Sequence, residues 1–439
     1  MRMTTAELKD ILLRFFVFVF LLTVLSFLLG SCTDECQTSR TYYYYEPVLK
    51  TMDQVRGEVQ VIDAQPVVAS GKIYLFGKTL FVNEPGKGIH VINNANKSNP
   101  IPLSFINIPG NVDMAVKDNI LYADSYLDIV VFDLSDVNNI KQVNRVEDVY
   151  MNYSNFVFSQ SGQHMVIVDY KKVENVEKIE SECDGDSRVF WRESGGVFFD
   201  ASVSFNANKA AVIGSQTGVG GSMARFAIYE KNLYAVDQSE LYVFDISNLT
   251  KPSLNNKVNL GWGIETIFPY KEKLFIGSNT GMQIFDNSNP SEPIHLSTFE
   301  HARVCDPVVV NDDYAFVTLR SGDRCSGFVN QLDVVDVKDL ENPKLVKSYQ
   351  MDNPHGLGVD GNTLFICEGE FGLKVFDIND VNDIDNNRLG HIQGIHAFDV
   401  IPYQNNLIMV GEEGLYQYDY TDPENLVLKS IIKVENLNK

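Results

Sequence analysis

Positive charge is scarce in this sequence of 439 residues, which has 36 lysines and arginines against 58 aspartates and glutamates. The formal net charge is −22 at pH 7. A surface that binds nucleic acid needs basic side chains to neutralise phosphates, so this balance argues against a nucleic-acid partner. The acidity is typical of a solvent-exposed, soluble surface, and it also suits cationic partners or metal ions.

Catalytic signatures are lacking as well. The chain has no Gly-x-Ser-x-Gly elbow, no His-Glu-x-x-His motif and no phosphate-binding loop, and its seven histidines are scattered. Asp-rich stretches such as 133–139 and 377–385 lack the Gly and Glu spacing of an EF-hand, so we interpret them as turns. The sequence therefore predicts no catalytic residue, and it leaves any cofactor or metal unknown.

The apolar run Phe15–Leu29 is too short for an ordinary membrane span, but it follows a basic start and fits the core of a signal peptide. It leads into Leu29-Gly30-Ser31-Cys32, which resembles a bacterial lipobox. The resemblance implies that residues 1–31 are removed and that Cys32 is acylated, with each buried methylene adding about 0.8 kcal/mol of membrane affinity. The alternatives are an uncleaved signal anchor and an ordinary secretory signal.

Residues 32–60 are expected to form a tether with a short helix within 47–59. The sequence 33–35 weakly resembles the acidic tag that carries some Gram-negative lipoproteins to the outer face of the outer membrane; the alternative is a solvated tether. The tyrosine-rich stretch 41–45 suits either packing on the main domain or a membrane interface. The expected location is the cell envelope, lipid-anchored to the outer membrane, with surface exposure as one orientation.

The sequence is rich in a recurring unit of two short apolar runs, the second ending in Asp or Asn. Residues 232–252, which contain NLYAVD and LYVFDISNLTKP, are a clear copy. Runs of β-branched and aromatic residues favour strands, and Asx turns and proline end them. Most copies lie about forty residues apart, the spacing of β-propeller blades. The second runs end at Asn93, Asp133, Asp245, Asp286, Asp336, Asp377 and Asp419.

This pattern predicts an all-β fold, a β-propeller of four-stranded antiparallel blades over residues 61–439; a β-solenoid or a pair of β-sandwiches is the alternative. The interval from Asp133 to Asp245 is too long for two periods and too short for three. We interpret it as one irregular blade, built on 155–170, with an insertion near 171–222 in which Gly218–Gly221 is flexible. The count is then eight blades, with seven as the alternative if this stretch forms a separate domain.

Residues 60–435 resemble the LVIVD-repeat family of bacterial β-propeller proteins, most closely its lipid-anchored members in Gram-negative bacteria. The motif that names the family is almost unchanged at 165–169, MVIVD. The phrases GKGIHVI at 86–92, GWGIETIFPYK at 261–271 and NPHGLG at 353–358 are similar to that group. The resemblance implies the fold and carries no established activity.

Polar side chains recur where the innermost strand of each unit is expected to begin, eight residues before the next apolar strand. Equivalent ends of innermost strands meet at one mouth of a propeller channel. Crowded carboxylates have raised pKa values or bind a cation, which predicts a ligand or metal site; alternatively, each carboxylate caps a turn in its own blade. The residues at or beside these positions are Asp113, Arg225, Glu265, Asp306, His355 and Asp399.

Cysteine usage agrees with an oxidising compartment. Cys305 and Cys325 flank the first two strands of one unit and are the candidates for a disulfide. Cys367 lies within a strand and is expected to be a buried thiol. Because Cys32 is assigned to the lipid, an odd number of the six cysteines remains, and at least one is unpaired.

These observations favour a binding or scaffold module of the cell envelope, whose partner is an envelope protein or a glycan. One alternative is a hydrolase or lyase that acts on a glycan or peptide at the acidic channel mouth. The other is a purely structural component of an envelope complex.

Overall fold

The computed structural model describes residues 15–20, 36–150, 156–158, 164–181, 217–300, 307–320 and 329–435. It divides into one unit of residues 1–48 and 169–198 and a second unit of residues 49–168 and 199–439. The expected lipidation site, Cys32, and the two disulfide candidates, Cys305 and Cys325, lie outside the described residues. Within the described part of the chain, no helix is long and apolar enough to cross a membrane.

A three-stranded sheet, separate from the repeats, has the order β1-β12-β11. Its strands are β1 (Cys36–Thr51), β11 (Phe156–Phe158) and β12 (His164–Ser181). β11 and the first residues of β12 come from the stretch 155–170 that was expected to form an irregular blade. That stretch pairs with β1 instead of starting a four-stranded sheet of its own, so it adds no blade.

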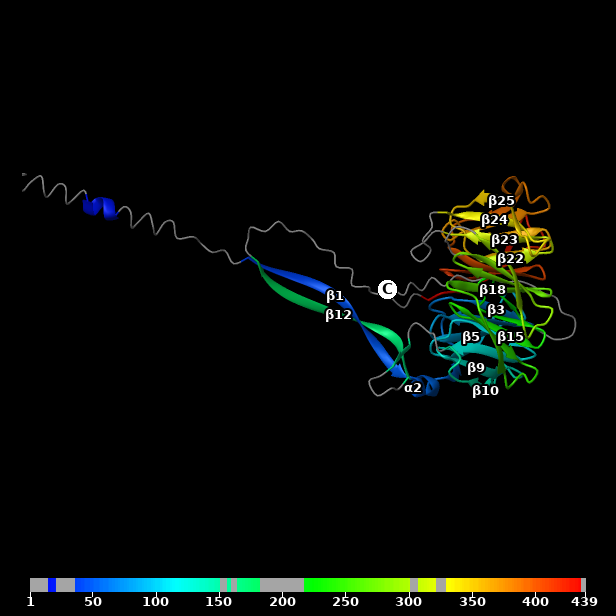
Figure 1. Ribbon diagram of the computed structural model, residues 1–439, viewed down its shortest axis with the longest axis horizontal. Helices are drawn as coiled ribbons and strands as arrows, with labels where there is room; N and C mark the ends of the chain where they lie inside the picture. The colour runs from blue at the N-terminus through cyan, green and yellow to red at the C-terminus, as the bar shows by residue number, and fades with distance from the viewer. Residues whose placement is uncertain are drawn as a thin grey trace, which may run out of the picture. The chain divides into compact units, whose positions relative to one another are not determined.

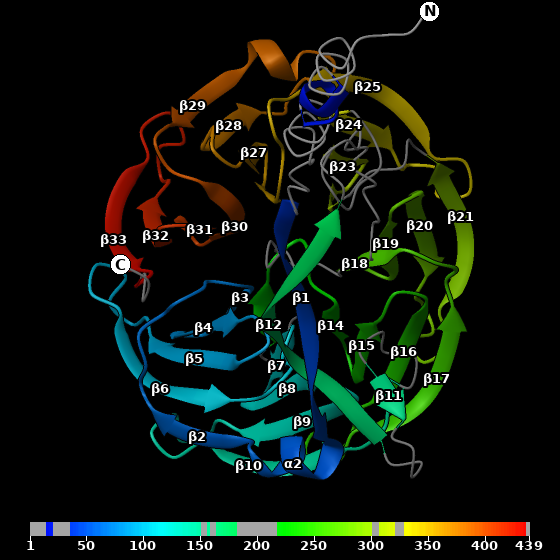
Figure 2. The same ribbon diagram turned by 90° about the vertical axis from the view of Figure 1, so that its left-hand side faces the viewer.

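Seven blades of four antiparallel strands form a β-propeller, which is the alternative count and not the eight blades favoured by the sequence (Figure 1). Each blade is one continuous stretch of chain whose first strand is innermost and whose fourth is outermost, as Figure 2 shows. The first three blades comprise β3 (Ile73–Phe76), β4 (Thr79–Glu84), β5 (Gly88–Asn93), β6 (Ile101–Asn107); β7 (Met114–Lys117), β8 (Ile120–Ser125), β9 (Asp128–Asp133), β10 (Lys141–Val146); and β14 (Phe226–Tyr229), β15 (Asn232–Val236), β16 (Glu240–Asp245), β17 (Ser253–Asn259).

The four remaining blades follow the same order along the chain. They comprise β18 (Ile264–Tyr270), β19 (Lys273–Ser278), β20 (Gly281–Asp286), β21 (Ile294–Glu300); β22 (Val308–Asn311), β23 (Tyr314–Leu319), β24 (Gln331–Asp336), β25 (Lys344–Gln350); β26 (Leu357–Asp360), β27 (Thr363–Cys367), β28 (Leu373–Asp377), β29 (Arg388–Ile392); and β30 (Ala397–Tyr403), β31 (Asn406–Gly411), β32 (Gly414–Asp419), β33 (Val427–Lys433). A 3-10 turn, η1 (Ile384–Asn386), precedes β29.

The middle strands of each blade are apolar without alternation because neighbouring blades cover both of their faces. In β16, the side chains from Leu241 to Phe244 are all fully buried. The outermost strand β17 alternates between exposed and half-buried positions, since one of its sides faces solvent. Between the third and fourth strands of every blade the register shifts at a β-bulge, which strengthens the local twist.

The Asp-rich stretches form paired Asx turns after the third strand of each blade. In the second blade, Ser135 N donates to Asp133 Oδ1 at 2.8 Å and Asn138 N donates to Asp136 Oδ1 at 3.0 Å. The sixth blade repeats this arrangement at Asp377 and Asp380. These carboxylates accept hydrogen bonds from backbone amides, as the side chains of turn residues do.

The ring closes between the first and last blades through side chains. Ile73, Leu75 and Val82 of the first blade share an apolar cluster with Ile401 and Val410 of the last. The carboxamides of Asn94 and Gln417 exchange two hydrogen bonds, of 3.0 and 2.7 Å, across the same seam. Seven continuous blades therefore close without a strand shared between the two ends of the chain.

Two short elements precede the first blade. β2 (Gln60–Asp63) pairs with β6 and adds a strand to the outer edge of that blade. Helix α2 (Met52–Gly57) begins at Thr51 with a capping box. Arg56 of this helix donates two hydrogen bonds, of 2.8 and 2.9 Å, to the buried carboxylate of Asp128, which fixes α2 to the second blade.

Residues 217–224 contact the innermost strands of four different blades, and this places the segment inside the ring. Gly218 N donates to Val116 O of the second blade at 3.0 Å. β13 (Val219–Gly220) pairs antiparallel with β3 of the first blade. Ala224 O accepts a hydrogen bond from Ile267 N of the fourth blade at 2.8 Å, and Ser222 Oγ accepts one from Leu357 N of the sixth at 3.4 Å.

The glycines of this segment serve close packing. A Cβ atom at Gly218 would overlap the ring of Tyr74, and one at Gly220 would lie 3.0 Å from the same ring. The interpretation of Gly218–Gly221 as flexible is therefore wrong for the described residues 217–224. These small residues allow the chain to pass along the innermost strands.

Candidate functional site

The strand registers define one equivalent position per blade, at or just before the start of the innermost strand. The next residue pairs in each blade with the fourth residue of the second strand, as Ile73 does with Val82 and Met114 with Ala123. Because these positions share one repeat phase, they lie at the same end of the channel. They are Lys72, Asp113, Arg225, Thr266, Pro307, Gly356 and Asp399.

Asp113 is the most highly connected of these residues, and it is only 3% exposed. Its Oδ2 lies 2.8 Å from Lys72 Nζ in the first blade. The same oxygen accepts hydrogen bonds from the backbone amides of Arg225 and Phe226 in the third blade. Asp113 thus joins three consecutive blades through one carboxylate, whose negative charge is balanced by Lys72.

Lys72 was not among the sequence candidates, although the eight-residue count from Leu80 reaches it. Burial lowers the pKa of Lys72, and the nearby Arg225 lowers it further, while Asp113 opposes both effects. The consecutive blades seven, one, two and three therefore carry Asp399, Lys72, Asp113 and Arg225 at equivalent positions. Acidic and basic side chains alternate around this half of the ring.

Asp124 supports the loop before the second blade. Its Oδ1 accepts hydrogen bonds from Val112 N and Asp113 N at 2.7 and 2.9 Å, and from Asn111 Nδ2 at 2.8 Å. Burial raises its pKa to about 6, although the two backbone amides lower it. Asp124 is a second residue that the sequence analysis missed, because it lies on the second strand of the blade and not on the innermost one.

Asp399 is fully buried, and neither of its carboxyl oxygens has a hydrogen-bond partner of normal geometry among the described residues. Burial raises its pKa well above the usual value; the Val400 amide and the positive charge of Lys72 offset part of this shift. A buried carboxyl group without partners favours its neutral form. Asp399 therefore differs from Asp113, which occupies the equivalent position and has several donors.

His355 is 5% exposed and adjoins the equivalent position of the sixth blade. Its backbone is fixed by hydrogen bonds to Cys367 O and from Thr318 Oγ1, both of 2.7 Å. Its ring packs on Phe398 at a centroid distance of 5.4 Å, and Nδ1 has no hydrogen-bond partner in the described part of the chain. Burial and the charge of Arg320 lower the pKa of His355 to about 3, so the imidazole is neutral near pH 7.

The remaining two sequence candidates are Glu265 and Asp306. Glu265 is half-buried beside Thr266 in the fourth blade. Asp306 lies outside the described residues, and the register places Pro307 at the equivalent position of the fifth blade. No group of three or more His, Cys, Asp or Glu side chains in the described ranges is placed to hold a metal ion.

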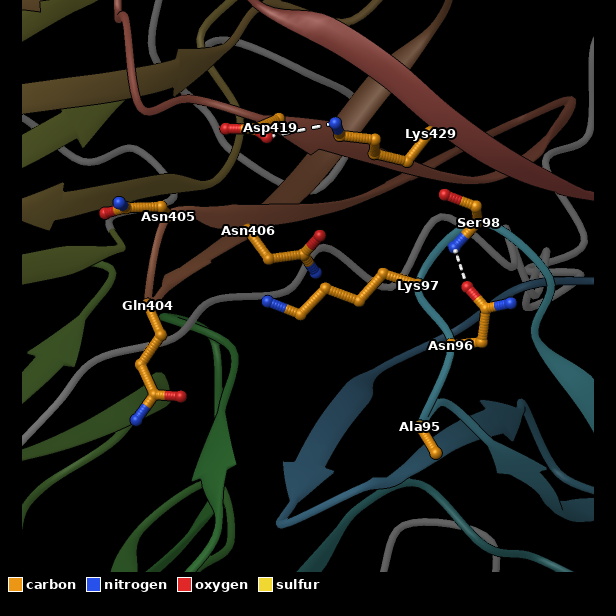
Figure 3. Close-up of a pocket in the computed structure, with 9 residues that line it drawn as sticks. All are labelled: Ala95, Asn96, Lys97, Ser98, Gln404, Asn405, Asn406, Asp419 and Lys429. Atoms are coloured by element: carbon orange, nitrogen blue, oxygen red, sulfur yellow. Dashed lines mark hydrogen bonds and ion pairs between the residues drawn. The ribbon is translucent and has the colours of Figure 1, made fainter.

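A separate groove of about 410 Å³ lies where the first and last blades meet, among their turns. Figure 3 shows Lys97 extending toward Asn406, while Lys429 pairs with Asp419 at 3.0 Å. These residues follow or connect strands at the ends opposite to Asp113 and Asp399, so the groove and the charged ring occupy different faces of the propeller. None of its lining residues was a sequence candidate.

Comparison with known proteins supports the repeat assignment. The model of the LVIVD repeat matches residues 220–259 and 302–351, although not the MVIVD stretch at 165–169. No curated protein matches the sequence.

Several solved structures are similar to this chain at low sequence identity. A functionally unknown protein from Desulfotomaculum acetoxidans is 10% identical with a TM-score of 0.49, covering 81% of this chain and 97% of its own. The computationally designed protein Ika8 is 11% identical with a TM-score of 0.48, over 83% and 87%. BamB from Moraxella catarrhalis is 8% identical with a TM-score of 0.47, over 85% and 97%. All three TM-scores lie below 0.5, so the propeller assignment rests on the strand order.

Proposed function

We propose that this propeller of LVIVD repeats is a binding or scaffold module of the cell envelope, anchored to the outer membrane by a lipid on Cys32. The observation that carries the binding role is the segment 217–224, which occupies the inside of the ring along four innermost strands. A channel that holds its own chain leaves the loops and the outermost strands as the surfaces for recognition. Lys72 and Asp113 next to this segment neutralise each other and serve blade-to-blade contact.

The anchor is tested by metabolic labelling with an alkyne analogue of palmitate, followed by fractionation of the cells. The intact chain is expected to carry the label and to sediment with the outer membrane. Cys32→Ala is expected to lose the label and to remain either soluble or unprocessed. A Cys32→Ala protein that is processed, labelled and membrane-bound would contradict the lipid anchor, while leaving the propeller's binding role untouched.

The binding role is tested by in-cell crosslinking at the propeller surface, with the lipid anchor intact. Photoreactive residues placed at exposed blade loops are expected to capture one reproducible partner or glycan. Photoreactive residues at exposed positions on the outer strands, such as Leu254, serve as the controls for the loop positions. Uniform, non-saturable crosslinking at every position would contradict a defined binding face.

A hydrolase or lyase is the second candidate, and Asp124 is the observation that favours it. A carboxyl group with a pKa of about 6 is suited to general acid–base catalysis near neutral pH. Cleavage of an envelope glycan or peptide that disappears in Asp124→Asn, with the fold unchanged, would support this activity. Equal cleavage by the two proteins would exclude Asp124 as its catalytic group.

A further inference from the structure

Trp262 is 72% exposed, which is more than any other exposed large apolar side chain of the described residues. It lies on the loop between β17 and β18, outside the network at the channel mouth. An indole ring has a large apolar face and one polar N–H, so its exposure leaves a sizeable surface uncovered. Exposed aromatic rings on loops are frequent anchors for ligands.

The backbone on either side of Trp262 has little freedom. Gly261 and Gly263 both have φ of +85°, a conformation that other residues rarely adopt. Gly263 N donates to Gln238 O at 2.8 Å, and Gly263 O accepts from Asn279 N at 2.8 Å. A Cβ atom at Gly263 would overlap the side chain of Asn279. The loop is thus held between the turns of two adjacent blades.

Further hydrogen bonds fix the start of this loop. Leu260 N donates to Ser239 O at 2.8 Å, and Leu260 O accepts from Gln283 Nε2 at 2.7 Å. Gly261 N donates to Asn259 Oδ1 at 3.2 Å. Since the loop is already ordered, a ligand that stacks on the indole loses little loop entropy on binding.

The charged residues at the edges of the loop are Asp237, Glu240, Lys257 and Glu265. Lys257 Nζ lies 3.7 Å from Glu240 Oε2, so these two charges offset each other. Asp237 is the single charged residue of the segments 237–239, 258–264 and 279–280. Its carboxylate is used by Ser239 N, Glu240 N and the Tyr242 hydroxyl, at 2.7 to 2.8 Å.

Free hydrogen-bonding groups beside the loop are carboxamides. Gln238 is exposed and Asn279 is half-buried, and neither side chain has a hydrogen-bond partner within the described residues. Each carboxamide offers both a donor and an acceptor. A ligand rich in hydroxyl groups can use both functions.

The apolar surface at this loop is confined to one ring. Leu260 and Ile264 on either side are buried, at 6% and 1% exposure. The nearest exposed large apolar residues along the chain are Leu254 and Ile294, on outer strands. A protein partner usually needs a broader apolar centre, so one aromatic ring amid neutral polar groups fits a sugar better.

From these observations we infer that the Trp262 loop binds a neutral oligosaccharide. The apolar face of a pyranose ring lies against the indole, and its hydroxyl groups bond to the carboxamides of Gln238 and Asn279. This inference extends the binding role proposed above, but it depends on neither the lipid anchor nor the charged ring.

The chain has two tryptophans, so Trp191→Phe leaves Trp262 as the only indole. This full-length variant is titrated with defined hexasaccharides of β-1,4-linked glucose, β-1,4-linked N-acetylglucosamine, α-linked mannose and β-linked galactose. At least one is expected to cause a saturable blue shift of the emission and a two-fold or greater protection from acrylamide quenching. Binding of the same sugar is then measured by isothermal titration calorimetry. Trp262→Ala should abolish binding, and Gln238→Ala should weaken it at least five-fold.

Phe371→Ala is the matched control, because Phe371 is a 42% exposed aromatic residue on a loop of another blade. It is expected to bind the sugar as the parent does, and circular dichroism should be the same for all variants. The inference is overturned if no hexasaccharide binds, or if binding persists in Trp262→Ala. Protection of Trp262 by an envelope protein alone would also overturn the carbohydrate class, while it would leave the proposed binding module standing.

Discussion

Lys72 Nζ lies 2.8 Å from Asp113 Oδ2, and both side chains are 4% exposed. The two residues immediately precede the innermost strands β3 and β7 of consecutive blades. Asp113 Oδ2 also accepts a hydrogen bond of 3.1 Å from the backbone amide of Phe226 in the next blade. This pair therefore connects three consecutive blades beside their innermost strands, and its loss should destabilise the ring.

Replacing Lys72 with Met should destabilise the protein by about 3–5 kcal/mol, because it leaves a buried carboxylate without its counter-ion. Denaturant unfolding measures this change. The double variant Lys72→Met/Asp113→Asn should lose less than the two single variants together, since both break the same interaction. Lys271→Met, which breaks an ion pair whose partners are both about two-thirds exposed or more, is the control and should have little effect. Additive losses would contradict the coupling.

Asp399→Asn should raise stability increasingly as the pH rises. The folded-state pKa of Asp399 lies well above the value of 3.8 for an unfolded chain. Above pH 3.8 the unfolded state releases this proton while the folded state retains it, so the parent loses stability until the folded pKa is passed. Calorimetry from pH 4 to pH 8 should give melting temperatures that coincide near pH 4 and separate above it. A constant difference would contradict the raised pKa.

Glu84→Gln should show the opposite dependence. Burial opposes ionisation of Glu84, but hydrogen bonds from His90 and Lys87 and from the Val68 amide lower its pKa to about 2. A lowered pKa adds stability above the unfolded value of 4.5, and this contribution is lost as the pH falls from 4.5 toward 2. The parent should therefore exceed the variant in melting temperature at pH 7, and the gap should close at low pH. A gap that widens on acidification would refute this assignment.

Gly218→Ala tests the close passage of the chain beside Tyr74. The added Cβ would overlap the tyrosine ring, so the variant should unfold at a clearly lower denaturant concentration. Gly57→Ala is the matched control, because nothing lies within 4 Å of its added Cβ and the residue ends a helix. Equal midpoints for both variants would contradict the packing of Gly218.

The blades were predictable because each carries its own local signal. In Leu241–Asp245, an apolar strand buried on both faces ends in an Asx turn, and the sequence records both features. The stretch 165–169 has the same composition, yet it lies in the strand that pairs with β1 more than a hundred residues earlier in the sequence. Composition predicts a strand but not its partner, and this explains the eighth blade in the sequence interpretation.

The candidate site was predictable only in part, because the eight-residue count depends on finding the first buried residue of a strand. In the fifth blade the count began at the half-buried Tyr314, whereas the register aligns the small, fully buried Ala315. The count therefore reached Asp306 instead of Pro307. In the first blade, the same count from Leu80 leads to Lys72. The partners of Asp113, and their absence at Asp399, depend on neighbouring blades and have no sequence signal.

The passage of residues 217–224 inside the ring is the central claim, because it assigns recognition to the outer surfaces of the propeller. Hydrogen–deuterium exchange of the full-length protein, followed by mass spectrometry, measures it directly. The peptide that covers 217–224 should exchange as slowly as peptides from innermost strands such as β3 and β7, with Gly218→Ala accelerating it. Exchange of that peptide within seconds, at the rate of an unstructured chain, would contradict the account.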